Sequence, residues 1–237
     1  MNQEKLKIGI IAATVWEMRA FIRKLGMNRK DRDHFESHFP RSSVYLQISG
    51  IGQNRARQAA EKISSFFPSL VISTGFCGAL KTGIEAGDIV LDIEKSNPER
   101  ISQLVQSAER NRIKIIQGKF LNVDHALLDK NEKLRLGMET GATAVEMESE
   151  AIEQVCKDKQ IPFYSFRAVS DTVNQNQPSL VTAIDPQGQL GLHFLKKLFF
   201  HPSEWFSFSR LALSSKKAEN SLARILIQLI EDCSKGE

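Results

Sequence analysis

The first apolar segment of the chain limits the fold more than any other feature. Residues 6–13 read LKIGIIAA, a continuous apolar run bounded by polar residues. A short run without polar alternation predicts a strand that is buried on both of its faces. Residues 17–25 follow with helical spacing through Met18, Phe21 and Leu25. A strand covered on both sides and followed by a helix is typical of an α/β protein.

Predicted strands and helices alternate along the chain as far as about residue 175. Apolar patterns predict strands at 6–13, 44–49, 70–74, 88–93, 113–120, 143–147 and 162–169, and helices at 17–25, 53–67, 98–112, 126–138 and 148–159. This alternation implies a largely parallel sheet with helices on both faces. Because no repeat or linker divides the chain before residue 175, we expect a single α/β domain over residues 1–237.

Composition excludes several classes of protein. Of the 237 residues, 41% are hydrophobic and 25% are charged, as in an ordinary globular domain. The net charge of +4 is spread along the chain, so we expect no nucleic-acid partner. The apolar run near the N-terminus is too short for a signal peptide or a membrane span. Three widely spaced cysteines, Cys77, Cys156 and Cys233, indicate reduced thiols and a cytoplasmic protein.

The character of the chain changes after residue 175. Residues 188–234 have a helical pattern that is broken at Pro202, with Ser203 as its N-cap. Six aromatic residues lie between Phe194 and Phe208, interleaved with lysines. This aromatic-basic extension could be a helix pair that packs on the domain or across a dimer. It could equally be a flap over an apolar substrate, or a surface that touches a membrane or lipid through residues 190–213.

Three segments raise the question of a cofactor or a metal. Residues 74–91 hold four glycines after a predicted strand, where they could admit a ligand or make two tight turns. Residues 49–57, SGIGQNRAR, lack the third glycine of a dinucleotide fingerprint. HFESH, residues 34–38, matches no zinc motif, so we interpret it as a surface segment. We expect neither a cofactor nor a metal, and we interpret Cys77 as a small buried thiol.

A cluster of carboxylates stands in the second half of the chain. Glu146, Glu148 and Glu150 surround Met147, and the next predicted strand ends at Ser170-Asp171. From the residues alone, these acids are either a solvated helix start with a loop aspartate behind it, or two halves of one active site.

Four motifs together resemble one protein family. IGIIAATVWE, SGIG, VISTGFCGALKTGIEAGDIVL and AVEMESEAI with IPFYSFRAVSDT follow, in order and at similar spacing, the pattern of the nucleoside phosphorylase/nucleosidase superfamily. The similarity covers about residues 6–175 and is greatest to the 5′-methylthioadenosine/S-adenosylhomocysteine nucleosidases. It implies a single α/β domain around a mixed, barrel-like central sheet. It also implies a protein that is usually dimeric and cleaves the N-glycosidic bond of nucleosides.

The resemblance also implies roles for individual residues. Glu17 matches the glutamate that orients the attacking water, Glu148 the one that binds the ribose hydroxyls, and Met147 the methionine packed against the sugar. Asp171, next to Ser170, matches the aspartate that donates a proton to purine N7. That role requires a protonated carboxyl, so we expect burial to raise the pKa of Asp171.

Two further acids have lesser expected roles. We expect Glu146 to support the substrate site and Glu150 to face solvent.

The choice between water and phosphate depends on residues 73–76. Phosphorylases of the superfamily place an arginine and a hydroxyl residue here, whereas this chain reads Ser73-Thr74-Gly75-Phe76. A phosphate dianion needs donors and positive charge, which a phenylalanine cannot supply. Arg19 is the one plausible substitute. We therefore expect Gly75 and Phe76 to border the substrate site and water to be the nucleophile, with phosphorolysis as the alternative.

The chain departs from the family pattern at two places. No phenylalanine matches the residue that stacks on the purine, and residues 122–128 read NVDHALL, so His125 or the C-terminal helices could cover the base. The aromatic-basic extension, with TGATAVEMES, is similar to a hopanoid-associated branch that removes adenine from adenosylhopane. An alternative of another class is a non-catalytic module that binds a nucleoside or a lipid.

Overall fold

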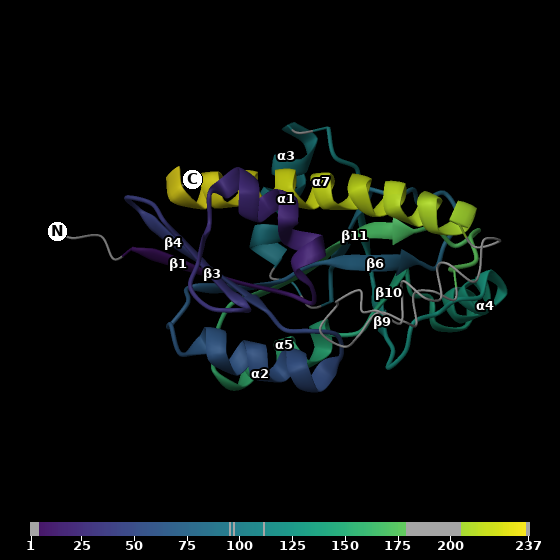
Figure 1. Cartoon of the computed structure of the whole chain (residues 1–237). Coiled ribbons are helices and arrows are strands. Elements are labelled where there is room, and N and C mark those ends of the chain that lie inside the picture. The colour runs from purple at the N-terminus through teal and green to yellow at the C-terminus, as the bar shows by residue number, and fades with distance from the viewer. Residues whose placement is uncertain (1–4, 95, 97, 111, 179–204, 236–237) are drawn as a thin grey trace.

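The computed structural model describes residues 5–94, 96, 98–110, 112–178 and 205–235 (Figure 1). Residues 188–204 of the aromatic-basic extension, which include Pro202 and Ser203, lie outside the described residues, so the structure does not test the predicted helix break. Among the described residues, no helix is long and apolar enough to cross a membrane.

One mixed sheet organises the described part of the chain. Its main path runs β2-β3-β4-β1-β5-β11-β6-β10-β9, with β7 paired to β11 and to β8. The strands are β1 (Leu6–Ala12), β2 (Asn28–Arg29), β3 (His34–His38), β4 (Ser42–Ile48), β5 (Leu70–Ser73), β6 (Phe76–Ala79), β7 (Ile89–Asp92), β8 (Ile115–Gly118), β9 (Phe120–Asn122), β10 (Ala144–Glu146) and β11 (Phe163–Asp171). The centre of the sheet is parallel, because β1 pairs in parallel with both β4 and β5, and β5 with β11.

Helices cover both faces of the sheet, as the alternating pattern predicts (Figure 1). The helices are α1 (Val15–Leu25), α2 (Gln53–Ser64), α3 (Pro98–Arg110), α4 (Lys130–Thr140), α5 (Ser149–Asp158) and α7 (Trp205–Lys235). The long α7 packs against α1, α3 and β11, whereas α2 and α5 pack against each other on the opposite face. This arrangement confirms the predicted α/β fold with a central mixed sheet and a C-terminal helical element.

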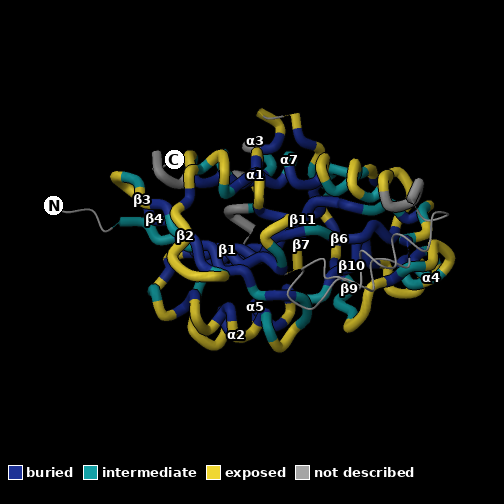
Figure 2. The backbone as a smooth tube through the Cα atoms, viewed as in Figure 1, coloured by how far each residue is buried: buried dark blue, intermediate teal, exposed yellow. Residues whose placement is uncertain are grey.

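Strand β1 is buried on both faces, as its continuous apolar run predicts. Ile8 and Ile10 belong to a hydrophobic cluster that includes Leu222 of α7. Ile11 points the other way, into a cluster with Ile152 of α5. Because successive side chains of a strand alternate between its faces, one strand joins two separate cores. Figure 2 shows these buried central strands between helices whose outer faces are exposed.

Residues 34–38 correct the sequence-based interpretation, because they form β3 rather than a surface segment. His34 is 4% exposed, and its ring stacks on Phe66 with ring centroids 5.2 Å apart. Its Nε2 lies 3.0 Å from Glu36 Oε1. The strand escaped detection because its polar residues hide the apolar alternation on which strand prediction depends.

Other boundaries also differ from the predicted ones. Residues 76–79 form β6 within the glycine-rich segment, and the expected strand at 113–120 is the two strands β8 and β9. Helix α4 begins at Lys130 rather than 126, because the Asp129 carboxylate caps it through the backbone N–H groups of Asn131 and Glu132.

Candidate active site

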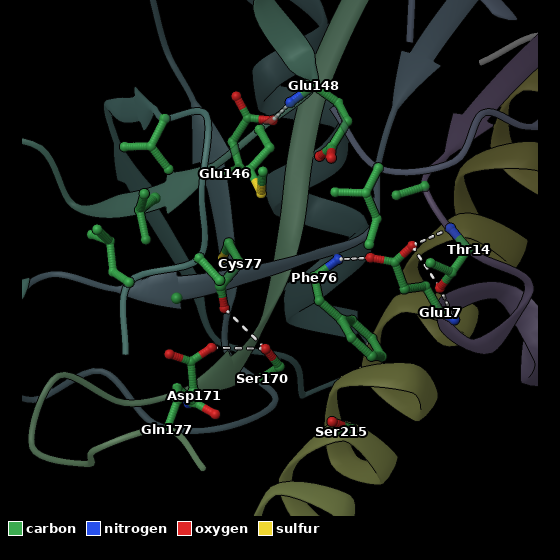
Figure 3. Close-up of a pocket in the computed structure, with 18 of the residues that line it drawn as sticks. Thr14, Glu17, Phe76, Cys77, Glu146, Glu148, Ser170, Asp171, Gln177 and Ser215 are labelled. Atoms are coloured by element: carbon green, nitrogen blue, oxygen red, sulfur yellow. Dashed lines mark hydrogen bonds between the residues drawn. The ribbon is translucent and has the colours of Figure 1, made fainter. Parts of the chain in front are cut away.

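A cavity of about 280 Å³ opens where the ends of several strands meet α7 (Figure 3). Residues from both ends of the chain line it, from Ala13 after β1 to Ser215 of α7. Most of its wall is apolar, and the carboxylates of Glu17, Glu148 and Asp171 reach it from different elements. Few polar groups set in an apolar hollow are typical of a small-molecule site.

Glu17 reaches the cavity from the first turn of α1. Thr14 and Glu17 form a capping box, in which the Thr14 N–H donates to Glu17 Oε2 at 2.7 Å. The other oxygen, Oε1, accepts a 2.8 Å bond from the Phe76 N–H. Burial raises the pKa of Glu17 even though these donors and the charge of Arg167 oppose the shift. The carboxyl is therefore fixed in position and is a better proton acceptor than an exposed glutamate.

Gly75 makes this position of Glu17 possible. Its φ of +141° is one that side-chain-bearing residues rarely adopt. A Cβ on residue 75 would lie 2.8 Å from Glu17 Oε1 and 2.9 Å from Arg167 Nη1. Gly75 is not itself part of the cavity wall, so it borders the site as scaffold while Phe76 lines the cavity.

Arg167 holds the carboxylates beneath the cavity together. It lies in the middle of β11 with a fully buried side chain, and its Nη2 donates to Glu146 Oε2 at 2.6 Å. Glu148 Oε2 lies 3.4 Å from the same nitrogen. Sequence reasoning missed Arg167, although an arginine inside the apolar strand FYSFRAVSD needs a buried partner.

Glu146 holds the backbone at the start of α5 through hydrogen bonds. Its carboxylate accepts bonds from the backbone N–H groups of Glu148 and Ser149, both at 2.8 Å, and from Ser149 Oγ at 2.7 Å. Burial acts to raise the pKa of Glu146, but the charge of Arg167 and these donors outweigh burial, and the pKa is lowered. Glu146 is therefore a fixed anion that orients the chain at the start of α5.

Glu148 presents its carboxylate to the cavity. It stands at the N-cap position of α5 without capping the helix, and its Oε1 accepts a 3.1 Å bond from the Gly52 N–H. Burial raises the pKa of Glu148 to about 7, helped by the charges of Glu146 and Glu17 and opposed by Arg167. Met147 also lines the cavity, whereas Glu150 is exposed as predicted.

Asp171 and Ser170 lie at the carboxyl end of β11, on the side of the cavity away from Glu17 (Figure 3). The pairing of β11 with β6 shifts register between Val169 and Asp171, and such irregularities re-aim side chains. Ser170 Oγ lies 3.0 Å from Asp171 Oδ1 and 3.3 Å from the carbonyl oxygen of Cys77.

The surroundings of Asp171 differ from the burial expected for it. Its side chain is 14% exposed, and its Oδ2 accepts a hydrogen bond from the ammonium of Lys133 on α4. Sequence reasoning did not single out Lys133. The signal available was its helical spacing with Leu136 and Gly137, which places a lysine on the inward stripe of α4.

The structure also shows where His125, Arg19 and Cys77 lie. His125 lines the cavity rim and binds Asp124 Oδ1 through Nδ1 at 2.6 Å. Arg19 is 62% exposed, covers the Trp16 ring and does not line the cavity. Cys77 is a buried free thiol, as predicted, and burial raises its pKa.

The fold and the carboxylates around this cavity define an enzyme that acts on a small molecule. A model of the phosphorylase superfamily matches residues 7–94 and 92–191. The chain therefore belongs to the phosphorylase superfamily.

Curated relatives agree with this assignment. A 5′-methylthioadenosine/S-adenosylhomocysteine nucleosidase of Buchnera aphidicola is 27% identical over 210 residues, which are 73% of this chain and 87% of the relative. A protein of the same name from Staphylococcus haemolyticus is 28% identical over 198 residues, with 70% and 87% of the two chains covered.

Solved structures share the fold. The Helicobacter pylori 5′-methylthioadenosine/S-adenosylhomocysteine nucleosidase, in complex with a substituted pyrrolidinol, aligns with a TM-score of 0.75 at 16% identity. The alignment covers 97% of this chain and 100% of the nucleosidase. Futalosine hydrolase from the same organism aligns with a TM-score of 0.73 at 16% identity, covering 96% and 98% of the two chains.

Proposed function

We propose that the protein is a purine nucleosidase that hydrolyses the N-glycosidic bond of an adenine nucleoside. One observation carries this proposal. Glu17, Glu148 and Asp171, which are far apart in the sequence, bring their carboxyl groups to one cavity. The nucleosidases among the relatives supply the reaction class.

Ribose is the part of the substrate assigned to Glu148 and Met147. An ionised Glu148 accepts hydrogen bonds from two sugar hydroxyls, and bonds to a charged acceptor are the stronger kind. Its carboxylate is already directed by the Gly52 N–H and by Arg167. Met147 adds an apolar contact against the sugar ring.

Water is the nucleophile, and Glu17 positions it. As the bond from C1′ to the base stretches, the sugar gains oxocarbenium character and is captured on the face opposite the base. Glu17 accepts one proton from the water while the water oxygen bonds to C1′. The raised pKa of Glu17 suits this step, because a proton acceptor works best when its pKa lies close to the working pH.

The departing base takes the bond's electron pair and a proton from Asp171. Proton donation to purine N7 removes the negative charge from the leaving group, and such general acid help is worth about 10²–10⁴-fold. Ser170 Oγ lies 3.0 Å from Asp171 Oδ1 and fixes the orientation of the carboxyl.

Phosphate is disfavoured as the nucleophile by the groups near the water position. Phe76 stands where a hydroxyl would be needed, and Arg19 points toward Trp16 instead of the cavity. Arg167, the guanidinium beneath the cavity, is already paired with two carboxylates. Among the described residues that line the cavity, a phosphate dianion would meet carboxylates and no free cation to balance it.

The 5′ group of the substrate is large and apolar in this proposal, as in adenosylhopane. The N-terminal part of α7 supports this choice, because Leu211 lines the cavity and Leu213 is 69% exposed. Residues 190–213 would then contact lipid, in a cytoplasmic homodimer that needs no cofactor. Methylthioadenosine and S-adenosylhomocysteine are the next substrates to consider.

A panel of 5′-substituted adenosines tests the proposed function. Each is incubated with and without phosphate, and adenine release is measured by chromatography. We expect phosphate-independent release that is fastest with long apolar 5′ groups. If all of the 5′-substituted adenosines were cleaved at the same rate, the proposal of a large apolar 5′ group would be wrong. Release of no base from any nucleoside would favour the non-catalytic binding module.

A further inference from the structure

Lys133 is the buried charge that the reaction above leaves without a role. Its side chain is 1% exposed, and its ammonium donates to Asp171 Oδ2. Among the described residues, its Nζ makes one further bond, 3.5 Å long, to the carbonyl oxygen of Gln175. A buried ammonium without a carboxylate would be very costly, so the two side chains hold each other in place.

The proposed reaction needs Glu148 ionised and Asp171 protonated at the same pH, and these two requirements conflict. Glu148 must be ionised to bind ribose, and its pKa of about 7 means that this form accumulates only near neutrality and above. An aspartate with an ordinary pKa near 4 keeps its proton in only about one molecule in a thousand at pH 7. A lone aspartate in the general acid position would therefore leave few molecules with both groups in the required form.

The contact between Lys133 and Asp171 resolves this conflict. Resting on the proposed function, we propose that Lys133 is a positioning residue that holds Asp171 Oδ2 and stores the proton that Asp171 passes to the leaving base. In the resting state, Lys133 is an ammonium and Asp171 is a carboxylate. When substrate displaces water, one Nζ–H bond breaks and an Oδ2–H bond forms, because a low dielectric favours the neutral pair.

The proton then leaves with the base. The bond from C1′ to the base breaks and its electrons pass to the purine, the Oδ2–H bond breaks, and an N7–H bond forms. Lys133 is left as a neutral amine beside the Asp171 carboxylate, and the pair regains one proton from solvent after the product departs.

The neighbouring elements restrict the pair to this geometry. Ser170 Oγ holds Asp171 Oδ1, and β6 passes so close that a Cβ on Gly78 would lie 2.9 Å from Oδ2. The other titratable groups around the pair are Cys77 on β6 and, on the cavity wall, Glu17, Glu146, Glu148 and His125.

The pH dependence of kcat/KM tests this role in wild type, Lys133→Met and Lys133→Arg. The wild type should rise through about pH 7 and stay high in the alkaline range. In Lys133→Met, the alkaline limb of the kcat/KM profile, where kcat/KM falls with rising pH, should move to lower pH by at least about one unit. At pH 8, kcat/KM should be about 10²-fold lower than in the wild type. Lys133→Arg keeps a cation but should lose the wild-type alkaline limb as well, because a guanidinium does not give up its proton. Lys130→Met, an exposed lysine on the same helix, is the matched control and should change nothing.

Several results would overturn the role of Lys133 alone. One is a Lys133→Met profile that is lowered equally at every pH, as a merely structural residue would give. Another is a Lys133→Arg profile that keeps the wild-type alkaline limb, because a guanidinium cannot supply the proton. Should Lys133→Met fail to fold, a wild-type profile that already falls between pH 5 and 7 decides against the proposal. A wild type that cleaves no nucleoside would overturn the proposed function as well, which keeps the two failures distinct.

Discussion

Arg167 Nη2 and Glu146 Oε2 lie 2.6 Å apart in the interior, and both side chains are at most 1% exposed. This ion pair joins β11 to the end of β10, next to the backbone that carries Glu148. The support beneath the substrate cavity is thus electrostatic as well as apolar.

Removal of the Arg167 guanidinium should lower the free energy of unfolding by much more than the ion pair itself contributes to it. Arg167→Met leaves Glu146 buried without its cation, and breaking a buried pair from one side costs about 3–5 kcal/mol. Denaturant unfolding measures this loss. Arg19→Met, which removes an exposed arginine, should change stability by less than about 0.5 kcal/mol. A loss for Arg167→Met as small as that for Arg19→Met would contradict the account of the pair.

The stability of the protein should depend on pH through Glu148. Its pKa is about 7 in the folded state and 4.5 in the reference state, so the folded protein binds the proton more tightly. This contribution to stability is complete below about pH 4.5 and is lost as the pH rises through about 7. Thermal unfolding from pH 4.5 to 8 should therefore show a decline that is smaller in Glu148→Gln. Identical slopes in the two proteins would show that Glu148 does not have this raised pKa.

Asp171, the proposed general acid, should be the residue of the second half of the chain whose substitution lowers activity most. Asp171→Asn keeps the shape of the side chain but cannot supply the proton, so kcat should fall by about 10²–10⁴-fold. Steady-state assays of adenine release measure the loss. Glu150→Gln changes a nearby exposed acid and should retain wild-type activity. Equal activity in Asp171→Asn and wild type would remove Asp171 from the mechanism.

Gly75 should matter for activity and not only for the backbone. Gly75→Ala and Gly83→Ala both place a side chain at positive φ, with φ of +141° and +79° in the parent chain, and both should lose about 1 kcal/mol or more. Only the alanine at 75 meets the carboxyl of Glu17, whereas a Cβ at 83 has no heavy atom within 4 Å. Gly75→Ala should therefore also lose at least about tenfold in kcat/KM, a loss of about 1.4 kcal/mol. A similar loss of activity in both variants would point to backbone strain alone.

The sequence predicted those parts of the fold and site that depend on local pattern. The apolar run of β1 and the alternation of strands and helices identified the fold class. The motifs singled out Glu17, Glu148 and Asp171, which the structure places around one cavity. Asp129, with Glu132 three residues later, was a readable helix start for α4 that the sequence analysis passed over.

The sequence pattern did not predict which residues from distant segments contact each other in the fold. The roles of Arg167 and Lys133 depend on carboxylates from other elements, and no local pattern specifies which acid a buried cation will meet. β3 was missed for a similar reason, because the His34 ring stacks on Tyr45 and Phe66, which come from other segments of the chain.

The stoichiometry of the products in phosphate-free buffer tests the central claim most directly. Wild type and Glu17→Gln are incubated with the most active 5′-substituted adenosine, and adenine and sugar are quantified by chromatography. The account predicts equal amounts of adenine and free sugar from the wild type, and a rate lower by at least about 10²-fold in Glu17→Gln. Base release that requires phosphate and yields a sugar 1-phosphate would contradict it.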